Sequence, residues 1–228
     1  TEEFDITNKI HLSAKYHRVS DSNYFKEIEH TNTSKETLDS IFELTYDDKS
    51  KDFSASILTE NEQVVNAGAP SYTRALEGSI SKTFNPKEAP IKVDLISTKF
   101  DHKTAGKVNG TRTHGDIEIS RVLKANYPKI TPRANVAITN YSLNNQSDIN
   151  RTIFGAGLDF DFTTIKLSSI YGYKVNHRIS PLITYNYRAK KIQGDIPIFD
   201  STDKYDDIIS FTDLTSGERY TGLDRITN

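Results

Sequence analysis

Carboxylates and histidines are the residue types in this sequence that could do chemistry, because its 228 residues include no cysteine. Asp159 and Asp161 would lie on one side of a strand, about 7 Å apart, which suits a pair of glycosidase carboxylates. Paired carboxylates are also ordinary in a water-filled protein interior. No nucleophile elbow or phosphate loop accompanies these two residues. We therefore predict no catalytic residue and no enzyme activity.

The six histidines do not follow the spacing of a metal site. His11 and His17 would share the polar face of one strand but lie about 20 Å apart, too far to bind one ion. An acidic stretch near the C-terminus offers the carboxylate oxygens that Ca²⁺ prefers, but it fits no regular calcium loop. Its carboxylates are Asp200, Asp203, Asp206 and Asp207. A solvated loop is the simpler interpretation, so we predict no metal and no cofactor.

The composition suits strands with one wet face. Apolar residues make up 35% of the chain, which is low for a compact core, yet 12 Tyr and 11 Phe argue against disorder. The net charge of -2, with both signs interspersed, predicts no nucleic-acid partner. The absence of methionine indicates a mature product or a fragment. Apolar runs are far shorter than the roughly 20 residues of a membrane helix, so contact with a membrane would be made by strands.

One segment near the N-terminus alternates along its whole length. In residues 4–16 apolar side chains take the even positions, except at Asn8, and polar side chains take the odd positions. Period-two alternation places the two sets on opposite faces of a strand. Because roughly ten residues of tilted strand cross a bilayer, we expect one membrane-spanning strand here. Lys9 and His11 would then face the lumen of a barrel.

The same alternation recurs along the chain. The further segments are about 37–46, 52–57, 76–84, 91–95, 117–119, 134–138, 154–163, 165–173 and 179–187. They bring the total to roughly ten antiparallel strands. In residues 154–163 the apolar side chains oppose Asp159 and Asp161, which we place among the lumen-facing polar residues. The predicted fold is an all-β, antiparallel transmembrane β-barrel with a wet interior, which explains the low apolar share.

Short polar connections alternate with longer ones. Residues 47–51 and 84–87 have the composition of tight turns, whereas residues 20–36 and 59–72 are predicted loops. Outer-membrane barrels show this asymmetry between their two ends. The strand rhythm ends after residue 187, and we expect a long, acidic, external loop at about 188–222.

Four stretches of sequence resemble one known family. Residues 16–25 read YHRVSDSNYF, which resembles the Y-x-R-V-S-D-x-x-Y-F element of LptD, the lipopolysaccharide-assembly outer-membrane protein family. Residues 179–187, ISPLITYNY, are similar to that family's L-E-P-R-x-x-Y-x-Y strand, although Ser180 and Leu182 replace the usual Glu and Arg. Residues 195–201, DIPIFDS, resemble its D-x-P-x-F-D-S/T loop, and residues 220–226, YTGLDRI, resemble Y/F-x-G-x-D-R-I. The matching positions, which we predict to be structural, are Arg18, Asp21, Tyr24, Phe25, Pro181, Asp195, Pro197, Asp200, Gly222, Asp224 and Arg225.

The resemblance implies a function in lipopolysaccharide assembly. In that family a periplasmic jelly-roll domain receives lipopolysaccharide from a periplasmic bridge, LptA. A barrel of about 26 strands then passes it to the outer leaflet, with the lipoprotein LptE as a plug. Residues 1–228 would be a single segment of such a barrel domain in the outer membrane of a Gram-negative bacterium. The jelly roll, the gate strands and the disulfide cysteines would lie outside it.

The implied partners are lipopolysaccharide, the outer membrane and an LptE-like plug lipoprotein. An LptA-like bridge would act through the absent N-terminal domain. Asp224 and Arg225 would form a structural ion pair, or else Arg225 would contact lipid phosphates. Tyrosines near strand ends would lie at the membrane interface. They are Tyr16, Tyr46, Tyr171, Tyr173, Tyr185 and Tyr187.

Two other functions stay open. A porin-like passive channel would need charges from an inward-folded loop, and the Asp-rich segment could serve. A soluble β-sandwich binding module would instead bury its apolar residues in a dry core. Those residues would be Phe4, Ile10, Phe42, Leu44, Phe160 and Phe162.

Overall fold

The computed structural model describes residues 2–22, 24, 36–65, 69–86, 89–123, 127–171, 173–189 and 196–200. The strands are β1 (Glu2–Thr7), β2 (Ile10–Lys15), β3 (Thr37–Asp48), β4 (Phe53–Val64), β5 (Thr73–Phe84), β6 (Ile91–Asp101), β7 (Gly110–Ser120), β8 (Lys129–Leu143), β9 (Ile149–Asp161), β10 (Thr164–Ile170), β11 (Tyr173–Ile179) and β12 (Leu182–Arg188). A 3-10 turn, η1 (Lys49–Lys51), joins β3 to β4. No helix among the described residues has the length and apolar character needed to cross a bilayer.

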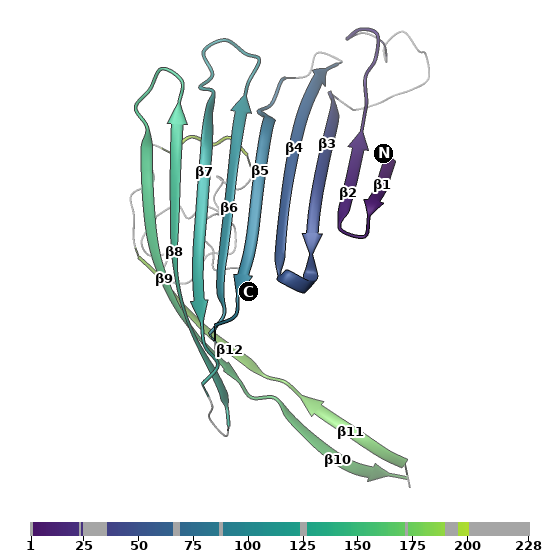
Figure 1. Ribbon diagram of the computed structural model, residues 1–228, viewed down its shortest axis with the longest axis vertical. Coiled ribbons are helices and arrows are strands. Elements are labelled where there is room, and N and C mark those ends of the chain that lie inside the picture. The colour runs from purple at the N-terminus through teal and green to yellow at the C-terminus, as the bar shows by residue number, and fades with distance from the viewer. Residues whose placement is uncertain are drawn as a thin grey trace.

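Ten of these strands form one antiparallel sheet. Their order is β1 to β9 in sequence, followed by β12, while β10 and β11 pair with each other in a separate hairpin. Figure 1 shows β1 to β9 side by side, with the β10–β11 hairpin extending away below β9 and β12. The prediction of an all-β antiparallel fold is confirmed. Among the described residues the sheet is open, with β1 and β12 at its edges.

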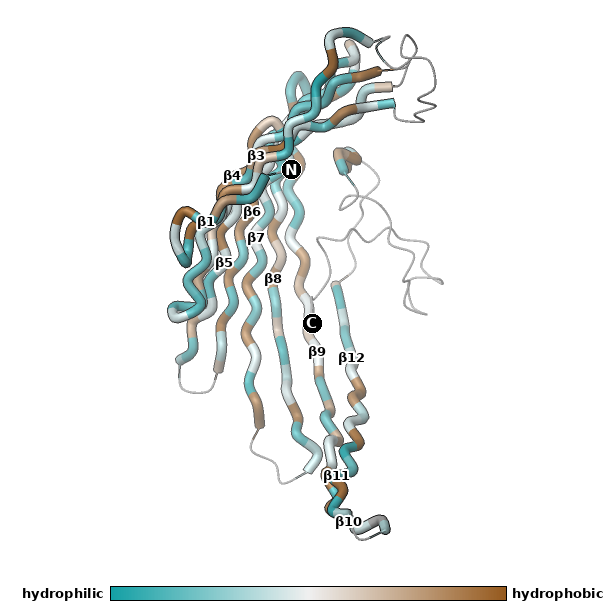
Figure 2. The backbone as a smooth tube through the Cα atoms, turned by 90° about the vertical axis from the view of Figure 1, so that its right-hand side faces the viewer, coloured by the Kyte–Doolittle hydropathy of each residue, from teal (hydrophilic) through white to brown (hydrophobic). Residues whose placement is uncertain are grey.

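The two faces of the sheet differ in chemistry because neighbouring residues in a strand point to opposite sides. We call the face that carries Phe42, Ile57, Ile117 and Phe154 the outer face, and the opposite face, with Thr98 and Arg112, the inner face. Figure 2 shows hydrophobic and hydrophilic residues alternating along the strands. Apolar side chains of the outer face are open to their surroundings.

The exposure of the outer face contradicts the soluble sandwich. Phe4, Phe42 and Leu44 are 52%, 44% and 43% exposed, and no second sheet covers them among the described residues. A sandwich would have buried them against a facing sheet. The prediction of a dry core formed by these side chains is therefore wrong.

The first predicted strand is a hairpin. Residues 4–16 divide into β1 and β2, with Asn8 and Lys9 in the turn between them. Phe4 pairs with Leu12 and Asp5 pairs with His11, so these partners are both even or both odd, although a register shift next to the turn pairs Thr7 with Ile10. The alternation therefore runs through the turn unchanged, and it could not distinguish a hairpin from one long strand. Asn8, the exception in the pattern, marked the turn.

The last two predicted strands are three. Residues 165–173 and 179–187 were expected as single strands, but the chain forms β10, β11 and β12. Tyr171, at the tip of the β10–β11 hairpin, has a φ of +50°, a left-handed conformation that reverses the chain. The predicted tight turn at 47–51 is confirmed, whereas β4 continues to Val64 and shortens the loop expected at 59–72.

Candidate functional site

A short segment far along the chain covers part of the inner face. Residues 196–200, which we name the inner segment, lie behind β6 and β7 in Figure 1, where they are drawn in yellow. Ile196 and Phe199 are 6% and 5% exposed and join a buried cluster on the sheet. The sheet contributes Phe100, Tyr141 and Leu143 to this cluster. The inner segment contains most of the DIPIFDS motif, so the motif marks a contact with the sheet.

Phe199 anchors the inner segment. Its ring stacks on Phe100 of β6, with centroids 4.7 Å apart and planes at 11°. Tyr72 meets Phe199 edge-on, with centroids 5.1 Å apart. The Tyr72 hydroxyl donates to the Val108 carbonyl over 2.9 Å, and burial raises the pKa of this hydroxyl. Offset and edge-to-face ring pairs of this kind add to the free energy gained by burying the rings.

Asp200 forms an ion pair with Arg112 of β7. The two terminal nitrogens of Arg112 donate to the two carboxylate oxygens of Asp200, each over 3.0 Å. The Arg112 side chain is 2% exposed, and its guanidinium lies over the Phe100 ring at 4.9 Å. A bidentate pair is among the stronger protein hydrogen bonds, and a buried arginine without its carboxylate would be costly. The inner segment therefore fastens to the sheet by one ring stack and one ion pair.

The polar layer of the inner face continues along neighbouring strands. Glu77 of β5 accepts from Thr98 Oγ1 over 2.7 Å and pairs with Arg74 over 3.3 Å. On β7 and β8, His114 Nδ1 lies 2.8 Å from Thr139 Oγ1, to which Arg151 also donates over 3.3 Å. Charged and hydroxyl side chains thus bind one another across the strands, which fixes their positions on the face.

A second charged cluster lies at the β9–β12 side of the sheet. Arg133 donates to Asp159 over 3.0 Å and to Asn186 over 3.1 Å, and Thr184 donates to the same Asp159 oxygen over 2.9 Å. Gly157 leaves room for this cluster, because a Cβ there would lie 2.9 Å from Asn186 Oδ1. The cluster ties β8, β9 and β12 together across the inner face.

The four residues predicted to face a lumen occupy different surroundings. Lys9 lies in the β1–β2 turn, where its Nζ binds Asp48 over 2.8 Å, and His11 of β2 binds Asp5 of β1. Lys9 is therefore a turn residue, not a strand residue as predicted.

Asp159 and Asp161 lie on the inner face of β9. Asp159 binds Arg133, as described above, and Asp161 accepts from the Thr163 backbone N–H over 2.8 Å. Each carboxylate is thus held by its own partner, an arrangement that orders the strand ends.

The motif residues that the structure describes fall into three groups. Arg18, Asp21 and Tyr24 follow β2 and are exposed, and Ser20 donates to Asp21 over 3.0 Å. Pro181 precedes β12, and its carbonyl accepts from the Phe162 N–H over 2.9 Å. Pro197 and Asp200 belong to the inner segment. Phe25, Asp195, Gly222, Asp224 and Arg225 lie outside the described residues.

The tyrosines predicted for a membrane interface are also spread out. Tyr16 follows β2 and Tyr46 lies near the other end of β3, both on the outer-face side. Tyr171 and Tyr173 lie at the tip of the β10–β11 hairpin, away from the ten-stranded sheet. Tyr185 and Tyr187 lie on β12. Their depth in a membrane stays a prediction.

The inner face offers a polar surface and the contacts that hold the inner segment on it. Within the described parts of the chain, no group of three or more His, Asp or Glu side chains could hold a metal ion. The sequence interpretation overlooked the buried inner-face charges Arg112, His114, Arg133 and Arg151. The even positions of residues 112–118 read Arg, His, Asp, Glu, and this polar run opposite Ile117 was a usable signal.

Comparisons with known proteins agree on one family. The model of the LptD family, described as LPS transport system D, matches residues 1–228. The LPS-assembly protein LptD of Nitrosospira multiformis is 30% identical over 136 residues, which cover 58% of this chain and 14% of that protein. The LPS-assembly protein LptD of Francisella tularensis subsp. holarctica is 25% identical over an alignment of 252 residues, covering 96% of this chain and 28% of that protein. The chain thus spans between 14% and 28% of the length of these two relatives.

Proposed function

We propose, because this chain belongs to the LptD family, that it forms part of the wall of an outer-membrane β-barrel that inserts lipopolysaccharide into the outer leaflet of a Gram-negative outer membrane. The strands would cross the bilayer. The outer face would contact lipid and the inner face would line the lumen. The chain would contribute no catalytic residue.

One observation carries this proposal: apolar side chains of the outer face are exposed on many strands, whereas the buried arginines Arg112, Arg133 and Arg151 lie on the inner face. Soluble proteins rarely expose an apolar patch that extends over so many strands. Hydrocarbon is the surrounding in which such a face is stable, provided that every strand is paired. The open edges β1 and β12 would therefore pair with further strands of a larger barrel.

The inner segment would narrow the lumen beside β6, β7 and β8. Its ring stack and ion pair hold a loop motif of the family against the wall. The family resemblance further suggests lipopolysaccharide as the cargo, an LptE-like lipoprotein as the plug and an LptA-like bridge on the periplasmic side. These partners are part of the proposal.

Adjacent positions on β5 test the membrane orientation. In the full-length protein that contains this chain, Ile80→Cys would carry a fluorescent probe on the outer face and Ser81→Cys would carry it on the inner face. We expect a lipid-borne nitroxide to quench the probe at position 80 and aqueous iodide to quench it at position 81. The same quenching at both positions, or the reverse pattern, would contradict the proposal.

A depletion strain tests the cargo. Removing the full-length protein should lower the amount of lipopolysaccharide at the cell surface, and resupplying the wild-type protein should restore it. If surface lipopolysaccharide is unchanged after depletion, the assembly function fails even where the strands cross the membrane.

A passive channel is the second candidate, and the inward position of residues 196–200 is the observation that favours it. The two functions predict different currents. A channel should pass ions steadily in planar bilayers, and removing Asp200 should alter its ion selectivity. A lipopolysaccharide translocon should restore surface lipopolysaccharide in the depletion strain. It should do so whether or not it conducts ions steadily.

A further inference from the structure

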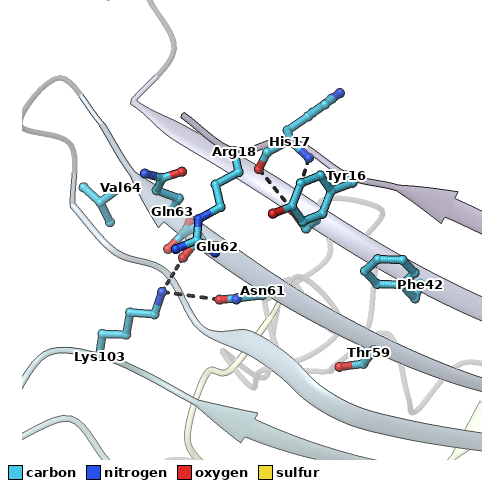
Figure 3. Close-up of a pocket in the computed structure, with 11 residues that line it drawn as sticks. Tyr16, His17, Arg18, Phe42, Thr59, Asn61, Glu62, Gln63, Val64 and Lys103 are labelled. Carbon is cyan, nitrogen blue, oxygen red and sulfur yellow. Dashed lines mark hydrogen bonds between the residues drawn. The ribbon is translucent and has the colours of Figure 1, made fainter. Parts of the chain in front are cut away.

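A pocket lies on the outer face beside the beginning of β3 and the end of β4. It has a volume of about 480 Å³ and lies beneath residues 16–19, which cross this face (Figure 3). Ser40 of β3 accepts from the His17 N–H and donates to the His17 carbonyl. The Gln63 side chain of β4 binds the backbone of Val19 in the same two-way manner. The crossing segment is therefore fastened, and the pocket beneath it is a built feature.

Two cations border this pocket from different parts of the chain. Arg18 belongs to the crossing segment, and Lys103 lies between β6 and β7; Figure 3 shows both side chains among those that line the pocket. Lys103 Nζ donates to Asn61 Oδ1 over 3.4 Å and also to the Glu62 carbonyl. Arg18 is exposed and no ion pair holds its guanidinium within the described residues. Among the residues that line the pocket, Glu62 is the one carboxylate, and it accepts from both the N–H and the hydroxyl of Ser71. Two cations against one carboxylate leave the pocket with a net positive charge.

An apolar groove continues from this pocket along the same face. It has a volume of about 470 Å³ and is lined by Leu44, Ile57, Ile80 and Leu95, among others. Gly78 lies in its floor, and a Cβ built there would meet nothing within 4 Å. The paired residues Phe42 and Thr59 border the cationic pocket. Leu44 and Ile57, which pair two positions away on the same two strands, border the groove.

We propose that the cationic pocket and the groove together hold one membrane lipid with an anionic, phosphorylated headgroup. Arg18 and Lys103 would bind the phosphate, and one acyl chain would lie in the groove over Gly78. From Asn61 to Ala55 the face extends about 20 Å along β4 at the rise of a strand, a length suited to an acyl chain. The inference rests on the proposed function in one respect: the outer face must contact lipid.

Native mass spectrometry of the full-length protein tests this site. The protein is released from bilayers that contain phosphatidylglycerol and phosphatidylcholine in equal amounts, and the retained lipids are counted. The test variant is Arg18→Gln with Lys103→Gln. Its matched control, Lys107→Gln with Arg121→Gln, removes two exposed cations that do not line the pocket. A second variant, Gly78→Leu, fills the groove while leaving both cations in place.

We expect the wild-type protein and the control to retain phosphatidylglycerol in preference to phosphatidylcholine. The Arg18 and Lys103 variant should retain roughly tenfold less phosphatidylglycerol, since two charge-assisted contacts are lost. Gly78→Leu should also lower retention. Equal retention of both lipids by the wild type, an equal loss in the control, or no effect of Gly78→Leu would overturn the proposal.

The outcome can be told apart from failure of the proposed function. If the probe at position 80 is quenched from lipid but no phosphatidylglycerol is selected, the outer face meets the membrane and the specific site is wrong. If that probe is not quenched from lipid, the membrane orientation itself is wrong.

Discussion

The two halves of the inner face contrast in burial although their strands alternate alike. On β6 and β7 the inner-face side chains Phe100 and Arg112 are fully buried, whereas on β2 His11 is exposed and Ser13 is half-buried. The inner segment packs on the β6 to β8 region, and the inner-face side chains of β2 have no such cover among the described residues. The burial of Arg112 is therefore determined by a segment from elsewhere in the chain. The strand pattern alone does not determine it.

Phe199→Ala should have the largest effect on this contrast. The substitution removes the stack on Phe100 and leaves a cavity, at a cost of about 3 kcal/mol to the docking of the inner segment. Amide hydrogen exchange in residues 198–200 should then be roughly a hundredfold faster. Exchange in β1 to β3 should not change. Ile198→Ala, at a neighbouring residue that is 47% exposed, is the control and should have little effect.

Arg112→Gln should have the next largest effect. It leaves the partly exposed Asp200 carboxylate without its bidentate partner, and we expect a loss of about 2 kcal/mol in docking of the inner segment. The comparison variant is Lys92→Gln, which breaks an ion pair with Asp94 in which both side chains are exposed. That change should cost less than about 0.5 kcal/mol. The measurement is again amide hydrogen exchange in residues 198–200. Similar exchange rates in the Arg112→Gln and Lys92→Gln variants would show that the Arg112–Asp200 pair contributes no more to docking than an exposed ion pair.

Gly157→Ala should have the smallest effect of the three. The new Cβ would crowd Asn186 Oδ1 and the Tyr185 carbonyl beside Arg133, so we expect a loss of about 1 to 2 kcal/mol. Gly78→Ala is the matched change on the open outer face, where the Cβ has space, and it should be neutral or stabilise by a few tenths of a kcal/mol. Thermal unfolding followed by circular dichroism compares them. An equal loss at both positions would contradict the description of the crowded inner face.

The strands could be predicted from the sequence because alternation reports directly on which face is apolar. Residues 37–46 and 91–95 were placed in strands that the structure contains as β3 and β6. The first hairpin could not be predicted this way, because from Glu2 to Asp5 its cross-strand partners share parity and the alternation continues past the turn. Only the break at Asn8 carried that information.

The site was recognised in part. The DIPIFDS motif identified residues 195–201 as a unit, but the surrounding segment was expected to be an external loop. The packing of Phe199 and Asp200 depends on Phe100 and Arg112, which lie about a hundred residues earlier in the chain. Neither local periodicity nor composition reports on such a contact, so the docking position needed the three-dimensional structure.

The separation between Arg112 and Asp200 is 88 residues, and it determines when their contact can form. Closing so long a loop costs conformational entropy that local strand pairing does not. During folding, Arg112 therefore stays hydrated while β7 pairs with β8 and β8 pairs with β9. It becomes buried after the chain has passed β12 and returned to β6. We expect the amides of the inner segment to become protected from exchange among the last events in folding. An Arg112 side chain that is shielded from water would then indicate that the later strands of the sheet have already formed.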